Sequence, residues 1–150
     1  MSNENTKKIL NQSVADLSVA TALIHQTHWY MRGAGFLKLH PYMDKLMDGL
    51  NDVLDELSER LITIGGSPVS TLKEFDELSK IDLQPTDWNV SMKDRLAKVL
   101  ATYKYLAEQF QEGIDAASEE GDAVTEGLYT DAKGDVEKTI WMLDAELADR

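Results

Sequence analysis

The stretch DKLMDGLNDVLDELSERLITIGG, residues 44–66, decides the fold class of this sequence. Its apolar residues recur at three- and four-residue steps, which places them on one face of an α-helix and leaves Asp and Glu on the rest. The Gly pair that closes the stretch, followed by Pro68, is a typical helix end. The stretch therefore predicts a long amphipathic helix that extends from near Leu37 to Ile64.

The same periodicity continues outward in both directions. Three more long helices are expected: one up to about Tyr30, one from Ser91 or Met92 to about Ser118, and one after a turn at residues 119–122. Asp122 is the expected N-cap of the last helix. Between the second and third long helices, residues 72–78 predict two helical turns and residues 84–88 predict a loop.

Four long helices with a single long connection are typical of a ferritin-like bundle. We therefore predict an all-α, ferritin-like four-helix bundle, with a short extra helix in the crossover between helices two and three. A length of 150 residues fits one domain, residues 1–150, and such a chain needs no disulfide or metal merely to fold. A hairpin excursion from a simple up-down bundle is the alternative explanation of the long connection.

The composition excludes several classes of protein. There is no cysteine, which excludes disulfide scaffolds, Cys nucleophiles, Cys-ligated zinc and iron–sulfur clusters. No apolar run approaches the length of about 18 residues needed for a membrane span, and Met1 to Lys8 include no apolar core of a signal peptide. We therefore expect a cytoplasmic protein with no membrane partner.

The net charge indicates which partners the protein can attract. Fifteen Lys and Arg against 27 Asp and Glu give a net charge of −12, which repels phosphate backbones and attracts cations. Only Lys7 and Lys8 form a basic cluster near the start of the chain, so we expect no DNA binding. The alternative explanation of the charge is that it merely keeps the protein soluble.

The second helix carries a set of possible metal ligands, His40, Asp44, Asp55 and Glu59. On a helical wheel all four fall within about 100°, on a face separate from the apolar stripe. However, Asp44 and Asp55 are 11 residues apart, which is about 16 Å along the axis. One helix therefore cannot gather the four side chains around one ion.

Two antiparallel copies of the helix can gather them. The positions 40 and 59 have the same sum as 44 and 55, so a two-fold axis near residues 49–50 would place His40 opposite the partner's Glu59 and Asp44 opposite the partner's Asp55. Two equivalent clusters of nitrogen and oxygen ligands would then form at a symmetric dimer interface. The alternative is that these residues are only a solvated acidic face.

His28 ends the first helix, and a turn at Gly33 and Gly35 could bring it beside His40. Two neutral imidazoles with carboxylates suit iron, manganese or zinc better than calcium or magnesium. His25, one turn earlier, is explained as an ordinary polar residue. The Glu-x-x-His pattern of di-iron sites inside a bundle is absent from the sequence, which argues against a site of that kind.

A family resemblance follows from these residues. The segment from His28 to Gly33, then Phe36, His40, Asp44, residues 55–60 and the Gly65-Gly66 pair resemble the Dps family of mini-ferritins, the DNA-binding proteins from starved cells. The spacing His-x11-His-x3-Asp-x10-Asp-x3-Glu matches the ferroxidase motif of that family at every ligand. Residues 138–142 resemble its fourth helix, so the resemblance covers nearly the whole chain.

The resemblance implies a hollow dodecameric shell that stores iron and protects against oxidative damage. It implies ferroxidase sites at the two-fold interfaces, where Fe(II) is oxidised by hydrogen peroxide or oxygen. One subunit would supply His28, His40 and Asp44, and its neighbour Asp55 and Glu59, with Trp29 adjacent to the site. Iron is the expected metal, with zinc as a possible occupant of the purified protein.

The resemblance also bears on DNA and on iron entry. Some family members bind DNA through a long terminal tail rich in Lys and Arg, and this sequence departs from that pattern. In such shells the region of Asp122, Glu126 and Asp131 lines pores at three-fold axes, and rings of carboxylates draw cations. The alternative for Asp122 and Glu126 is helix capping and a favourable interaction with the helix dipole.

Two other functions remain open at this point. The histidines all lie in the first 40 residues, which is compatible with a three-histidine helix-bundle metalloenzyme, such as a hydrolase. A non-enzymatic, nucleoid-binding shell is the second alternative.

Overall fold

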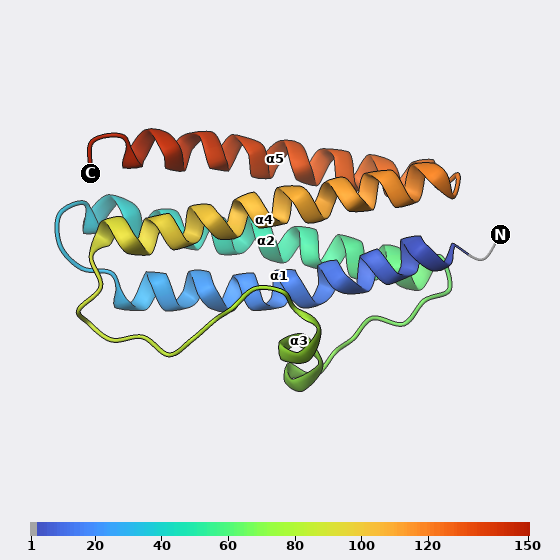
Figure 1. Ribbon diagram of the computed structural model, residues 1–150, viewed down its shortest axis with the longest axis horizontal. Helices are drawn as coiled ribbons and strands as arrows, with labels where there is room; N and C mark the ends of the chain where they lie inside the picture. Colours follow the sequence, from blue (N-terminus) through green and yellow to red (C-terminus); the bar gives the residue numbers. More distant parts are fainter. Residues whose placement is uncertain (1–2) are drawn as a thin grey trace.

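The computed structural model describes residues 3–150, which form five α-helices and no strand (Figure 1). The helices are α1 (Glu4–Tyr30), α2 (Phe36–Thr63), α3 (Leu72–Leu78), α4 (Met92–Glu119) and α5 (Ala123–Leu147). The predicted all-α class and the short helix in the crossover are confirmed. Met1 and Ser2, the first residues of the segment that argued against a signal peptide, lie outside the described residues.

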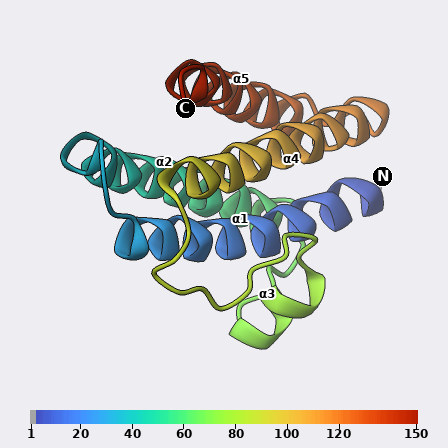
Figure 2. The ribbon, with the colours of Figure 1, turned by 60° about the vertical axis from the view of Figure 1, so that its left-hand side comes forward.

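Two antiparallel helix pairs, α1 with α2 and α4 with α5, make up the bundle, and α1 also packs against α4. Figures 1 and 2 show the crossover from α2 to α4 returning along the outside of the bundle, so that these two helices run in the same direction. The crossover carries α3, which packs against α1. Leucines from all four long helices fill the core between the pairs.

A buried carboxylate on α1 holds the crossover in place. Asp16 is fully buried and accepts hydrogen bonds from the Ser79 hydroxyl (2.8 Å), the Lys80 amide (2.9 Å) and the Tyr105 hydroxyl (2.6 Å). Burial of a carboxylate is tolerated when hydrogen bonds satisfy it in this way. The long connection is therefore fixed to both α1 and α4.

Most helix starts are capped by a local side chain. Thr71 and Glu74 form a capping box on α3, and Ser91 and Asp122 cap α4 and α5. The N-cap residue of α1 makes no such bond. None of the helices between residues 3 and 150 is long and apolar enough to cross a membrane.

The side chain that caps the start of α1 belongs to a residue far away in the sequence. Glu120, in the α4–α5 turn, accepts hydrogen bonds from the Asn5 amide (3.2 Å), the Thr6 amide (2.7 Å) and the Thr6 hydroxyl (2.6 Å). These are amides of the first turn of α1, which would otherwise have no partner. One carboxylate thus joins the start of the chain to the last helix pair.

Candidate metal centre

The turn between α1 and α2 brings the two predicted histidines together. Gly33 (φ 104°) and Gly35 (φ 93°) both adopt the left-handed backbone region, which glycine occupies at little cost. The chain reverses direction between Tyr30 and Phe36, and His28 at the end of α1 comes beside His40 at the start of α2. The predicted role of this turn is confirmed.

The two imidazoles are held by a reciprocal pair of hydrogen bonds. Nδ1 of His28 lies 2.7 Å from the carbonyl oxygen of His40, and Nδ1 of His40 lies 2.9 Å from the carbonyl oxygen of His28. The rings stack with centroids 3.6 Å apart and planes 9° apart. Each histidine therefore fixes the orientation of the other.

These bonds determine which ring nitrogen is free. A carbonyl oxygen can only accept, so each Nδ1 must carry the proton and donate it. In the neutral ring, Nε2 then presents a lone pair, which is the form that binds metal ions. Both histidines are thus prepared as Nε2 ligands.

Asp44 adds a carboxylate to the buried His28. Its Oδ1 lies 3.4 Å from Nε2 of His28. Two ligand atoms at this separation, each about 2.1 Å from one ion, subtend roughly 108° at that ion, an angle that suits metal coordination. The pair can therefore hold one ion between them.

A stacking residue beside this cluster was not assigned a role from the sequence. The ring of Phe36 stacks on His40 with centroids 4.7 Å apart, so His40 lies between Phe36 and His28. Its spacing of four residues from His40 on the same helix is the signal that could have found it. Trp29 is 63% exposed and stacks on His25 at 4.9 Å, and neither ring is part of this stack.

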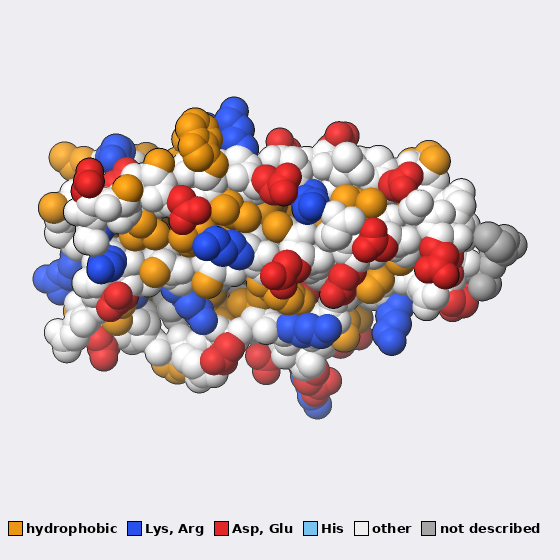
Figure 3. Space-filling view, turned by 45° about the horizontal axis from the view of Figure 1, so that its top comes forward, with side chains coloured by type: hydrophobic (Ala, Val, Ile, Leu, Met, Phe, Trp, Pro, Cys, Tyr) orange, Lys and Arg blue, Asp and Glu red, His pale blue; other side chains and the backbone are white. Residues whose placement is uncertain are grey.

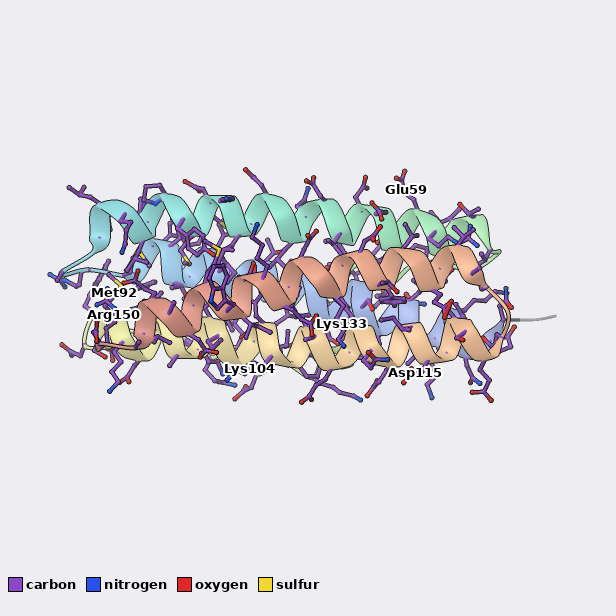
Figure 4. The ribbon with its side chains drawn as sticks, turned by 90° about the horizontal axis from the view of Figure 1, so that it is seen from above. Glu59, Met92, Lys104, Asp115, Lys133 and Arg150 are labelled. Carbon is purple, nitrogen blue, oxygen red and sulfur yellow. The ribbon has the colours of Figure 1, made fainter. Side chains whose placement is uncertain are left out.

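The other two predicted ligands lie further along α2. Asp55 and Glu59 are exposed and one turn apart, and neither carboxylate makes a hydrogen bond or ion pair within the described part of the chain. Figure 4 shows Glu59 on the side of α2 that faces away from α5. Within residues 3–150 no group of three or more His, Asp or Glu side chains could hold a metal ion. One chain therefore presents two separate sets of candidate ligands: His40 and Asp44 of α2 with His28 of α1, and Asp55 with Glu59 further along α2.

The three residues predicted for an iron-entry pore differ in their environments. Asp122 is buried, and its Oδ1 lies 2.8 Å from Nη2 of Arg60 and 3.0 Å from the Thr125 amide. Burial works against ionisation of this carboxyl, but the hydrogen bonds from Thr125 and Arg60 outweigh it and lower the pKa of Asp122. Glu126 is partly exposed and Asp131 is exposed. The predicted N-cap role of Asp122 is confirmed.

Comparisons with known proteins place this chain in a family. The ferritin-like domain family matches residues 7–150. A DNA protection during starvation protein of Streptococcus suis is 53% identical, over 95% of this chain and 83% of its own. The chain belongs to the Dps family. Its ferritin-like fold, expected from the single long crossover, is confirmed by the same comparison.

Solved Dps structures have the same architecture. A Dps from Listeria monocytogenes superposes with a TM-score of 0.94 at 42% identity, over 95% of this chain and 93% of that one. A Dps from Listeria innocua, soaked with zinc, gives a TM-score of 0.92 at 41% identity, over 95% of this chain and 96% of that one. The match in fold thus extends over nearly the whole chain.

Proposed function

We propose that this Dps protein is a ferroxidase that oxidises Fe(II) at sites shared between two subunits and stores Fe(III) in a hollow dodecameric shell. The observation that carries the proposal is the division of ligands on α2. His28, at the end of α1, lies beside His40 and Asp44 at one end of the acidic face of α2. Asp55 and Glu59 lie exposed about 16 Å along α2 from Asp44 and have no partner within residues 3–150. A two-fold axis across α2 would join each set to the complementary set of a neighbour.

The ligands divide the chemistry between them. Asp55 and Glu59 supply negative charge that favours Fe(III), and Glu59 is suited to bridge two ions. The imidazoles are neutral ligands that let iron leave after oxidation. Two Fe(II) ions give one electron each to hydrogen peroxide, its O–O bond breaks, and two protons complete two waters. Supplying both electrons together avoids the hydroxyl radical, which would protect the cell from oxidative damage; oxygen is the second possible oxidant.

The proposal also includes the domain organisation, the cellular compartment, a second metal and the absence of DNA binding. Residues 1–150 would form one Dps-type domain that assembles and works in the cytoplasm. The ligand set also suits zinc, so zinc is expected beside iron in purified protein. Because the net charge is −12, the shell should not retard duplex DNA in a gel at about 0.15 M salt.

Mixed shells test the shared site. His40→Ala and Asp55→Ala should each abolish most iron oxidation, because each removes a ligand from every site. In shells assembled from a mixture of the two variants, some interfaces join one subunit of each kind. At such an interface one site carries both mutations and the other site carries neither, so the intact site should recover activity. The readout is ferric absorbance after peroxide is added to Fe(II) under anaerobic conditions. No recovery in mixed shells of full mass would overturn the proposal.

Particle mass separates this proposal from the three-histidine metalloenzyme. The metalloenzyme would work as a small oligomer, whereas the proposed shell has twelve subunits. His25 stacks on Trp29 and does not join His28 and His40, which gives no support to a three-histidine site within one chain. Light scattering on the protein used for the oxidation assay decides between the two.

A further inference from the structure

A groove separates α2 from α5. The last helix packs along α4 and makes few contacts with α2. Figure 2 shows α5 tilted away from α2, and Figure 4 shows side chains of both helices directed into the space between them. The groove has a volume of about 260 Å³. That is below the range of about 300–1,000 Å³ typical of drug-sized ligands, so a single slender ligand would fit it best.

The groove is long and its polarity changes along its length. On α2 its lining runs from Tyr42 to Val53, a rise of about 16 Å. Because α5 runs antiparallel to α2, Thr139 lies toward the Tyr42 end and Ala132 toward the Val53 end. Polar groups gather at the first end, while the second end is apolar.

Two ammonium groups belong to the polar end. Lys45 and Lys138 line the groove, are exposed, and form no ion pair within residues 3–150. One carboxylate, Asp135, lines the groove closer to its middle, so the charged lining carries one net positive charge. In a chain with almost twice as many acidic as basic residues, this local excess of lysine favours an anion.

The tyrosine at this end adds a hydrogen-bond donor. Tyr42 is half-buried, and burial raises the pKa of its hydroxyl, although a hydrogen bond with Thr139 opposes the rise. The hydroxyl therefore stays protonated at neutral pH and can donate to an oxyanion. Leu50 and Val136 form the apolar wall beyond it.

The groove is distinct from the proposed iron site. Gly49, in the middle of the groove, lies about 130° around α2 from the centre of the face that carries Asp44 and Asp55. A partner that covers the ligand face through a two-fold axis would therefore leave the groove open. Nothing lies within 4 Å of the position that a Cβ atom would take at Gly49, so there is open space for the first atom of a side chain at this position in the groove lining.

We propose that this groove binds the anion of a single-chain fatty acid. The carboxylate would lie between Lys45 and Lys138, and the alkyl chain would extend over Leu50 and Val136 toward Val53. The charge of the head matches the lysines, and the apolar end matches a chain of medium length. This site is independent of the proposed ferroxidase activity.

Calorimetric titration of the assembled, iron-free protein with sodium decanoate tests the proposal. Saturable binding at one site per chain is expected. The double variant Lys45→Gln/Lys138→Gln should bind about tenfold more weakly, equivalent to about 1.4 kcal/mol. The control Lys93→Gln/Lys104→Gln makes the same charge change at exposed lysines outside the groove and should bind as the unmodified protein does. Light scattering must show an unchanged particle mass for each variant.

Two further ligands and one further variant sharpen the test. Decyltrimethylammonium has the same alkyl chain with a cationic head and should bind much more weakly, and butyrate should not saturate the site. Gly49→Leu should abolish decanoate binding by filling the groove. The proposal is overturned by an absence of saturable decanoate binding below its micelle concentration. It is also overturned if the two double lysine variants weaken decanoate binding equally, or if the cationic ligand binds as well as decanoate.

Discussion

The acidic residues Asp55 and Glu59 of α2 and those of the α4–α5 turn differ in their hydrogen-bond and ion-pair partners. Asp55 and Glu59 are exposed and have no partner within residues 3–150. In the turn, Glu120 accepts hydrogen bonds from Asn5 and Thr6 of α1. Asp122 accepts one from Arg60 of α2 and others from Thr125 in the first turn of α5. Figure 3 shows one face of the molecule, on which acidic side chains are more numerous over the half nearest the α4–α5 turn. Net charge therefore does not identify a site, because some of the acidic residues hold the helices of the bundle together.

The largest effect expected from this comparison is on iron oxidation. The variant Asp55→Asn/Glu59→Gln keeps the shape of both side chains and removes two anionic ligands, so it should lower the initial rate of Fe(II) oxidation by about a hundredfold or more. Its thermal midpoint should stay the same, because neither carboxylate has a partner among residues 3–150 to lose. Ferric absorbance and calorimetry measure the two quantities.

A neighbouring pair provides the matched control. Asp52 and Glu56 are exposed on the same helix with the same spacing. Asp52→Asn/Glu56→Gln makes the same charge change and should leave oxidation nearly unchanged. An equal loss of rate in both double variants would show that general acidity, and not the ligand face, sustains the reaction.

In the turn the expected loss is in stability. Asp122→Ala removes the N-cap of α5 and leaves the Arg60 guanidinium without its ion-pair partner, so the free energy of unfolding should fall by about 3 kcal/mol. Asp122→Asn keeps an oxygen for the Thr125 amide and should cost less. Asp131→Ala, at an exposed position of the same helix, is the control. Chemical denaturation in which Asp122→Ala costs no more than the control would contradict the structural role.

The sequence predicts this fold well because its helices are separated by strong local signals. The predicted helix ends near Tyr30, Met92 and Ser118 lie within one residue of the observed ones, and residues 72–78 form α3 as expected. Amphipathic periodicity and glycine turns act over a few residues, so they can be read directly from the sequence.

Contacts between distant residues could not be predicted in the same way. Glu120 and Thr6 are 114 residues apart, and Arg60 and Asp122 are 62 apart. The pairing of His28 with the carbonyl of His40 needs the geometry of the turn between them. The candidate ligands on α2 could be proposed from the sequence because their spacing on one helix is regular. The position of the Nδ1 protons, which leaves each Nε2 free, could not be.

A smaller effect is expected for the cap of α1, and it depends on pH. Hydrogen bonds from the Thr6 side chain and from the amides of Thr6 and Asn5 lower the pKa of Glu120. A depressed pKa contributes stability that is present above the unfolded value of about 4.3 and is lost as pH falls through the folded value. Glu120→Gln should therefore lower the thermal midpoint at pH 7, and the difference from the unmodified protein should shrink in acid.

Glu119→Gln serves as the control for this variant, because Glu119 is exposed and adjacent. The midpoint of that variant should match the unmodified protein at both pH values. A difference between Glu120→Gln and the unmodified protein that stays constant down to about pH 3 would mean that the ionised carboxylate does not hold the start of α1.

The smallest expected effect concerns the entry of iron, and it tests whether any carboxylate near the turn remains free to act on cations. Asp122 is a poor probe because its replacement also disturbs Arg60. Glu126 is partly exposed and forms no ion pair within residues 3–150, so Glu126→Gln isolates the charge. If rings of carboxylates draw Fe(II) inward, this variant should take up iron about two- to threefold more slowly at low ionic strength. The difference should disappear near 0.5 M salt, where charges are screened over about 4 Å.

Asp144→Asn makes the same charge change on α5, far from the turn, and should have no effect. Equal uptake by Glu126→Gln and Asp144→Asn at low salt would leave the turn with its capping role alone.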